Sequence, residues 1–129
     1  MVILVFAAAV AAAPESFVST HLESLPNGMR PAAYAAHLVE ESGPFSAQDR
    51  GVTGTFLNGL HVLGFIGHER RSMFVYFVPD QPKVCIVRDE HFSGRRSEAA
   101  ENAGFRSCNA AFGLTPSPRA PRVQFRPGQ

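Results

Sequence analysis

The chain of 129 residues contains no tryptophan, a single lysine and only two cysteines, and its net charge is +1. A charge so close to zero creates no overall field that would attract a nucleic acid or an acidic substrate. Recognition of nucleic acid would also need basic side chains beside stacking aromatics. Phe74 and Tyr76 have no Lys or Arg two residues away on either side. We therefore expect no specific nucleic acid among the partners.

The sequence also lacks the common motifs of catalysis. It has no Gly-x-Ser-x-Gly segment, no Gly-x-Gly-x-x-Gly segment and no phosphate-binding loop with Lys followed by Ser or Thr. A reactive thiolate needs a neighbouring base or cation. Cys85 lies between Val84 and Ile86 in an apolar run, and Cys108 has only Arg106 near it in the sequence. We therefore identify no catalytic residue and no cofactor site.

The longest hydrophobic run is Met1–Ala13, which ends at Pro14. As a helix it would rise roughly 20 Å, less than the ~30 Å hydrocarbon core of a bilayer, so we expect no transmembrane span. Its length and small residues are typical of a signal peptide, with cleavage after Ala11, although no Lys or Arg precedes the run. These features predict a periplasmic or secreted protein. The alternative is a cytoplasmic protein in which Met1–Phe6 forms a buried strand.

The two cysteines, Cys85 and Cys108, fit an exported protein with one disulfide. A bridge between them would stabilise the fold by roughly 3 kcal/mol by restricting the unfolded chain. Two unpaired thiols are the alternative, because the sequence does not show whether the two Cα atoms lie within about 7 Å of each other.

Four strand-like runs follow one another in the middle of the chain and predict an antiparallel meander. They are Val52–Leu57, Leu60–Ile66, Met73–Val78 and Val84–Val87. The dipeptide Asn58-Gly59 suits a two-residue type I′ turn between the first two. Met73–Val78 is apolar at odd and at even positions alike, which indicates a central strand that is covered on both faces.

One layer of helices can cover only one face of that strand. The C-terminal segment, a second copy of the chain or another partner must cover the other face. Phe74, Tyr76 and Val78 are therefore our candidate interaction face, with an unknown protein partner or self-association as the expected contact.

Helices are predicted on both sides of the meander. Glu15–Leu25 has a helical spacing of apolar residues, and Pro31–Ser42 begins with proline and ends before Gly43-Pro44. Ser97–Asn102 predicts one or two helical turns with Ser97 as cap and Gly104 as stop, and Phe105–Leu114 is expected to fold back onto the sheet. The sequence thus predicts an α+β domain, with one or two helices packed on an antiparallel meander of three to four strands. We expect a signal peptide over residues 1–13, a single domain over 14–113, and a disordered tail rich in Pro and Arg over 114–129.

The meander contains a pattern of turn and strand residues: Asn58-Gly59, Phe65, Ser72-Met73-Phe74, Pro79-Asp80 and Cys85-Ile86-Val87. This pattern resembles that of a group of short exported proteobacterial proteins of unknown function. That group has an apolar leader, a helix and a three-stranded meander with a Cys in its last strand. The resemblance implies the same fold and export, and it implies no activity. The group's Trp and its Cys before the helix are absent here, so a bridge to the tail would have to replace the usual one.

Taken together, these features predict a small exported protein that acts as a non-catalytic interaction or accessory module. The alternative is a metal-binding protein or a metal-dependent enzyme that uses the loop histidines His61, His68 and His91. No two histidines have the short spacing of a zinc motif, so such a site would depend on how the strands are ordered.

Overall fold

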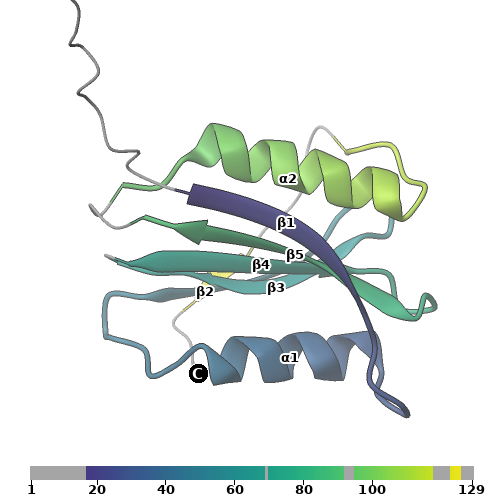
Figure 1. Ribbon diagram of the computed structural model, residues 1–129, viewed down its shortest axis with the longest axis horizontal. Coiled ribbons are helices and arrows are strands. Elements are labelled where there is room, and N and C mark those ends of the chain that lie inside the picture. Colours follow the sequence, from purple (N-terminus) through teal and green to yellow (C-terminus); the bar gives the residue numbers. More distant parts are fainter. Residues whose placement is uncertain (1–16, 69, 92–94, 118–122, 126–129) are drawn as a thin grey trace, which may run out of the picture.

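In the computed structural model, an antiparallel β-sheet lies between two α-helices (Figure 1). Residues 17–68, 70–91, 95–117 and 123–125 are described. The elements in chain order are β1 (Phe17–Ser24), α1 (Pro31–Glu41), β2 (Arg50–Thr55), β3 (His61–Ile66), β4 (Arg71–Phe77), β5 (Lys83–Glu90), α2 (Glu98–Ala111) and β6 (Val123–Phe125). The strands lie side by side in the order β1-β5-β4-β3-β2-β6. The predicted α+β fold class is confirmed, and β1 and β6 enlarge the predicted sheet.

The meander forms where the sequence predicts it, from β2 to β5. Its first turn is one residue longer than expected. The Phe56 N–H donates to the Leu60 carbonyl at 2.7 Å, and the Gly59 N–H donates to the Phe56 carbonyl at 2.9 Å. Gly59 has φ +93°, a backbone conformation that glycine adopts without steric cost. The turn is therefore a three-residue loop, residues 57–59, which contains the predicted Asn58-Gly59 together with Leu57.

The two helices cover opposite faces of the sheet, with α2 above it and α1 below it in the view of Figure 1. Because side chains alternate along a strand, β4 sends Met73 and Val75 toward α1 and sends Phe74 and Tyr76 toward α2. All four side chains are buried. The prediction that this strand is covered on both faces is confirmed, and the C-terminal segment supplies the second cover.

The predicted helix at Glu15–Leu25 is wrong, because Phe17–Ser24 forms strand β1. This strand pairs antiparallel with β5 from Phe17 opposite Glu90 to Ser24 opposite Lys83. The helical spacing predicted for this segment depends on few apolar residues, and the β-branched Val18 and Thr20 suit an extended chain. The backbone hydrogen bonds available along β5 decide the outcome, and the local sequence does not contain that information.

The helix predicted at Ser97–Asn102 extends to Ala111 and runs through the expected stop at Gly104. Ser97 does cap this helix, because its hydroxyl accepts from the Ala100 N–H at 3.3 Å. A Cβ atom at position 104 would lie 2.7 Å from the Thr20 hydroxyl oxygen and 2.9 Å from the Val87 side chain. Glycine is therefore the residue that allows α2 to lie directly on β1 and β5.

A disulfide bond joins Cys85 of β5 to Cys108 of α2, as predicted. The two Cα atoms are 5.6 Å apart, within the usual range for a bridge, and both residues are buried. Around them the α2-side core contains the aromatic side chains of Phe56, Tyr76 and Phe105. The Phe105 ring lies 5.0 Å from the Phe56 ring and 5.4 Å from the Tyr76 ring, measured between centroids.

The two ends of the chain are described only in part. The predicted signal peptide, residues 1–13, lies outside the described residues. Within the predicted disordered tail, Val123–Phe125 forms β6 and pairs with β2, from Thr53 opposite Val123 to Gly51 opposite Phe125. No helix among the described residues is long and apolar enough to cross a membrane.

Replacing Gly104 by Ala should lower the free energy of unfolding by about 1–2 kcal/mol, because crowding against Thr20 and Val87 outweighs the gain in helix propensity. Denaturant unfolding of the oxidised protein measures this change. Ser107→Ala, at an exposed position of the same helix, is the matched control and should change stability by less than ~0.5 kcal/mol. A Gly104→Ala protein as stable as the parent would show that α2 does not need this close approach.

Candidate functional site: a buried polar cluster at the start of α2

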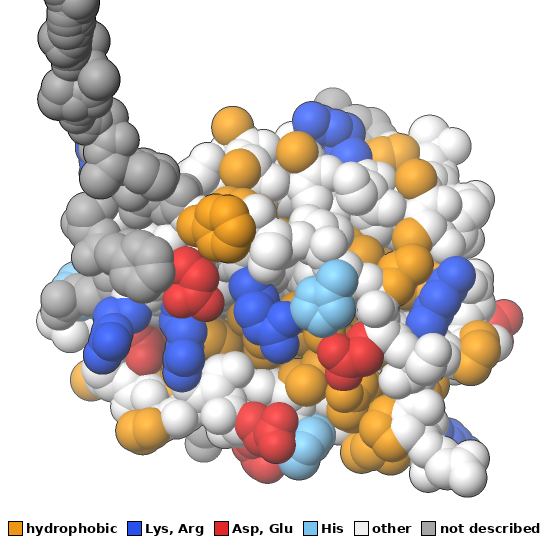
Figure 2. All heavy atoms as spheres, in the orientation of Figure 1, with side chains coloured by type: hydrophobic (Ala, Val, Ile, Leu, Met, Phe, Trp, Pro, Cys, Tyr) orange, Lys and Arg blue, Asp and Glu red, His pale blue; other side chains and the backbone are white. Residues whose placement is uncertain are grey.

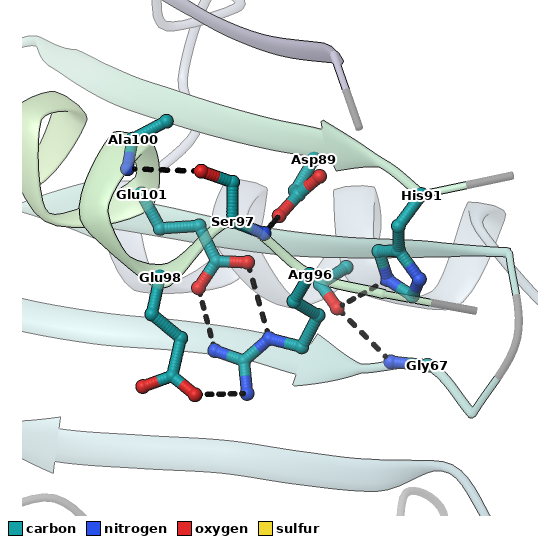
Figure 3. Close-up of polar contacts among 9 residues, drawn as sticks. Gly67, Asp89, His91, Arg96, Ser97, Glu98, Ala100 and Glu101 are labelled. Atoms are coloured by element: carbon teal, nitrogen blue, oxygen red, sulfur yellow. Dashed lines mark hydrogen bonds and ion pairs between the residues drawn. The ribbon is translucent and has the colours of Figure 1, made fainter. Parts of the chain in front are cut away.

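Polar side chains collect inside the protein where the start of β4, the end of β5 and the first turn of α2 meet (Figure 3). Ser72 lies opposite Asp89 in the β4–β5 register. His91 follows Asp89 by two residues, the spacing that places side chains on the same face of an extended chain. Ser72, Asp89 and His91 are 1%, 0% and 0% exposed, and Glu101 of α2 is also buried. The sheet register thus brings together residues that are far apart in the sequence.

Ser72 and His91 form one half of this cluster. The Ser72 hydroxyl oxygen lies 3.0 Å from Nε2 of His91 and accepts a hydrogen bond from the Gly67 N–H at 3.2 Å. The hydroxyl can therefore donate its own proton to Nε2 of a neutral imidazole. Burial lowers the pKa of His91 below its ordinary value, which favours that neutral form. Nδ1 of His91 has no hydrogen-bond partner among the described residues.

Asp89 and Arg96 hold the first turn of α2. One Asp89 carboxylate oxygen accepts from the N–H of Ser97, the capping residue, at 3.0 Å. Arg96 donates to both carboxylate oxygens of Glu101, at 3.1 Å from Nε and 2.5 Å from Nη2. Its other terminal nitrogen lies 4.0 Å from a carboxylate oxygen of Glu98. Two-pronged pairing of this kind fixes the orientation of both side chains, so the turn before α2 is clamped to the helix itself.

The electrostatics of this half of the cluster are set by two carboxyl groups near one guanidinium group. Burial raises the pKa of Glu101 from 4.5 to about 7, and the neighbouring Asp89 carboxyl acts in the same direction. The hydrogen bonds from Arg96 oppose this rise but do not cancel it. The protonated form of Glu101 is therefore populated near neutral pH.

A serine hydrogen-bonded to a histidine is also the arrangement of a nucleophile and its general base. Two features of this pair do not suit catalysis. Both side chains are buried, so a substrate carbonyl has no route to the Ser72 oxygen. In a catalytic triad a carboxylate orients the histidine through Nδ1, and no described residue binds that atom. The contact therefore joins the start of β4 to the residue that follows β5.

The three histidines predicted as metal ligands are not brought together. His61 begins β3, where its ring stacks on Phe77 at 5.3 Å between centroids, whereas His68 follows the other end of the same strand. His91 is buried against Ser72 near that second end. Among the described residues, no group of three or more His, Cys, Asp or Glu side chains could hold a metal ion. The antiparallel register separates His61 from the other two, so the structure does not support the metal-site alternative.

The predicted interaction face of Phe74, Tyr76 and Val78 lies inside the α2-side core. Phe74 and Tyr76 are 1% and 2% exposed, and Val78 packs against the same cluster. A hollow of about 380 Å³ lies above Phe74 and Tyr76, with Arg96 and Phe105 among its other lining residues. Because α2 already covers the aromatic rings, these residues have almost no exposed surface with which to contact a partner. This corrects the prediction of an interaction face at these residues.

Sequence reasoning found Ser97 as a helix cap but missed Ser72, Asp89, Arg96 and Glu101. A signal for part of the cluster was present, because Asp89 and His91 follow Cys85 and Val87 at alternate positions and so continue the side of the strand that faces the core. The contact between Arg96 and Glu101 depends on where α2 begins. The pairing of Ser72 with His91 depends on the β4–β5 register.

No protein-family model matches this chain, and no match of significant similarity is found among curated proteins or solved structures. The resemblance to short exported proteobacterial proteins therefore stays a prediction.

Glu101→Gln should remove a pH dependence of stability. Between about pH 4.5 and pH 7, Glu101 is protonated in the native protein and ionised in the unfolded chain. Because the native state binds the extra proton, the free energy of unfolding falls as pH rises through that window. His91 acts with the opposite sign below its ordinary pKa of 6.5, because its native pKa is lowered. Comparison of the variant with the parent isolates the contribution of Glu101.

The measurement is denaturant unfolding of both proteins across that pH window. Glu98→Gln is the matched control, since Glu98 lies beside the same guanidinium but its side chain is 82% exposed. The control should still show the fall in stability across this window, because it leaves Glu101 in place. A Glu101→Gln protein with the same pH profile as the parent would show that this carboxyl does not titrate differently in the two states.

Proposed function

We propose that this chain is an exported, disulfide-bonded protein that acts as a non-catalytic interaction module and binds its partner along the outer edge of β1. One observation carries the proposal: β1 is an edge strand of the sheet and exposes apolar side chains. Phe17 is 65% exposed and Leu22 is 49% exposed. Among the described residues, no strand pairs with the outer side of β1.

The exposed apolar residues support binding at this edge. Three large hydrophobic side chains are exposed among the described residues, and two of them, Phe17 and Leu22, belong to β1. Figure 1 shows β1 in purple at the near edge of the sheet, and Figure 2 shows this side of the molecule with basic, acidic and apolar side chains intermixed. A strand edge of this kind offers backbone hydrogen bonds to an added strand, and exposed side chains provide the specificity.

The disulfide supports an oxidising location. Disulfide bonds form and persist in oxidising locations such as the periplasm or the outside of the cell, and they are rare in the cytosol. Cys85–Cys108 lies inside the core that fastens α2 to the sheet. The apolar leader expected at residues 1–13 suggests the same location by its composition. The non-catalytic role agrees with the buried polar cluster, whose hydrogen bonds hold β4, β5 and α2 in place.

Export should be visible in the intact mass of the protein recovered from a Gram-negative periplasm without reduction. We expect loss of Met1–Ala11 and a mass lower by the two hydrogens that the disulfide removes. Reduction before the measurement should restore those two hydrogens and is the internal control. A full-length mass with two free thiols, found only in the cytoplasm, would contradict the location.

Binding at the β1 edge should be visible by site-specific photo-crosslinking in the same cells. A photoreactive amino acid at position 22 should give a discrete adduct with a protein, because the side chain lies at the proposed contact. Position 57 is the matched control, since Leu57 is 78% exposed but lies in the turn between β2 and β3. Adducts at neither position, or equally at both, would contradict a binding role for β1.

A further inference from the structure

The backbone of β1 presents its free hydrogen-bonding groups in a known pattern. The Leu25 N–H donates to the Pro82 carbonyl at 3.1 Å, so Leu25 faces β5. In an antiparallel strand, successive residues direct their N–H and C=O groups to alternate sides. The outward-facing residues are therefore the four even-numbered residues of the strand, Val18, Thr20, Leu22 and Ser24.

This edge lacks the devices that usually prevent strand pairing. Edge strands are commonly protected by proline, by lysine, by a bulge or by short length. β1 is eight residues long and its sequence, FVSTHLES, contains no Pro, Lys or Arg. Its only carboxylate, Glu23, accepts a hydrogen bond from the Tyr34 hydroxyl of α1 and lies 3.3 Å from Nε2 of His21. Within the described parts of the chain, the residues of β1 thus leave this edge able to pair with another strand.

We propose that the partner at this edge is a second copy of the chain, with the two β1 strands paired antiparallel about a twofold axis. The inference rests on the proposed function and names its partner. A twofold axis perpendicular to the sheet keeps the α2 face of both copies on the same side. Residues that lie opposite each other point their side chains to the same face, so even-numbered residues of one copy lie opposite even-numbered residues of the other. These are the residues whose backbone groups face outward.

One register uses all four outward-facing residues. It places the two His21 residues opposite each other, pairs Val18 with Ser24 of the second copy, and pairs Thr20 with Leu22 of the second copy. A shift by one step toward the N-terminus would leave Ser24 opposite Ser16, before the strand begins. In the full register, the two Leu22 side chains are diagonal neighbours, close enough for apolar contact.

The charges of β1 suit pairing with a second copy of the same strand. On the α2 face of β1, the side chains of Val18, Thr20 and Leu22 are uncharged, so no like charges meet there. On the other face, Glu23 of each copy becomes a diagonal neighbour of His21 of the other copy. Glu23 therefore has an imidazole, and no second carboxylate, as its diagonal neighbour across the twofold axis, and the two His21 rings lie directly opposite each other.

Leu22→Pro tests this contact selectively. Proline has no N–H, and the Leu22 N–H faces outward, so the ladder between β1 and β5 keeps its hydrogen bonds. Leu22→Lys tests the same contact without a backbone change. Leu57→Lys is the matched control, because Leu57 is exposed outside β1.

The readout is the molar mass of the oxidised protein by sedimentation over a concentration series, with circular dichroism as the check on folding. The parent and Leu57→Lys should reach twice the chain mass, and both Leu22 variants should keep the chain mass with an unchanged spectrum. A parent protein that is monomeric at every concentration would overturn self-pairing, as would a folded Leu22→Lys protein that still dimerises.

Crosslinking at position 22 separates this inference from the proposed function. An adduct of two identical chains supports both. An adduct with a different protein, together with a monomeric parent, keeps the interaction module and overturns the second copy as partner. The absence of any adduct at position 22 overturns both.

Discussion

The close packing of α2 on the sheet is the constraint on which the rest of the structure depends. Gly104 leaves the helix free to touch Thr20 and Val87, and the Cys85–Cys108 bridge joins helix and sheet covalently. With α2 in this place, the aromatic side chains of β4 are enclosed by Phe105 and its neighbours. Without it, one whole face of the meander would be an exposed apolar surface large enough to promote aggregation.

The buried polar cluster also attaches α2 to the sheet. Polar groups inside a protein destabilise it unless they are hydrogen-bonded, and most of these atoms are. Asp89 holds the capping residue of α2, and Arg96 pairs with Glu101 within the same turn. The cluster therefore fixes the beginning of α2, whereas the disulfide fixes its second half. Because Glu101 titrates near neutral pH, the strength of this attachment depends on pH.

The candidate site was harder to predict than the fold. The meander could be located from local patterns, since Gly59 marks its first turn and the four apolar runs mark its strands. His61, His68 and His91 were candidates only because their residue type binds metals, and the antiparallel register then placed His61 at the far end of β3. Phe74 and Tyr76 were candidates because a single layer of helices leaves one face of their strand without a cover, and the sequence could not show that α2 provides it.

The sequence by itself determined the elements whose signals are local. Alternating or continuous apolar runs, a glycine at the first turn, a proline at the start of α1 and Ser97 at the start of α2 each act over a few residues. The tertiary structure decided the rest. β1 is a strand because β5 offers it a hydrogen-bonding edge, and α2 continues through Gly104 because a missing side chain there permits contact with the sheet. Both outcomes depend on residues distant in the sequence, whose positions are set only when the whole sheet has formed.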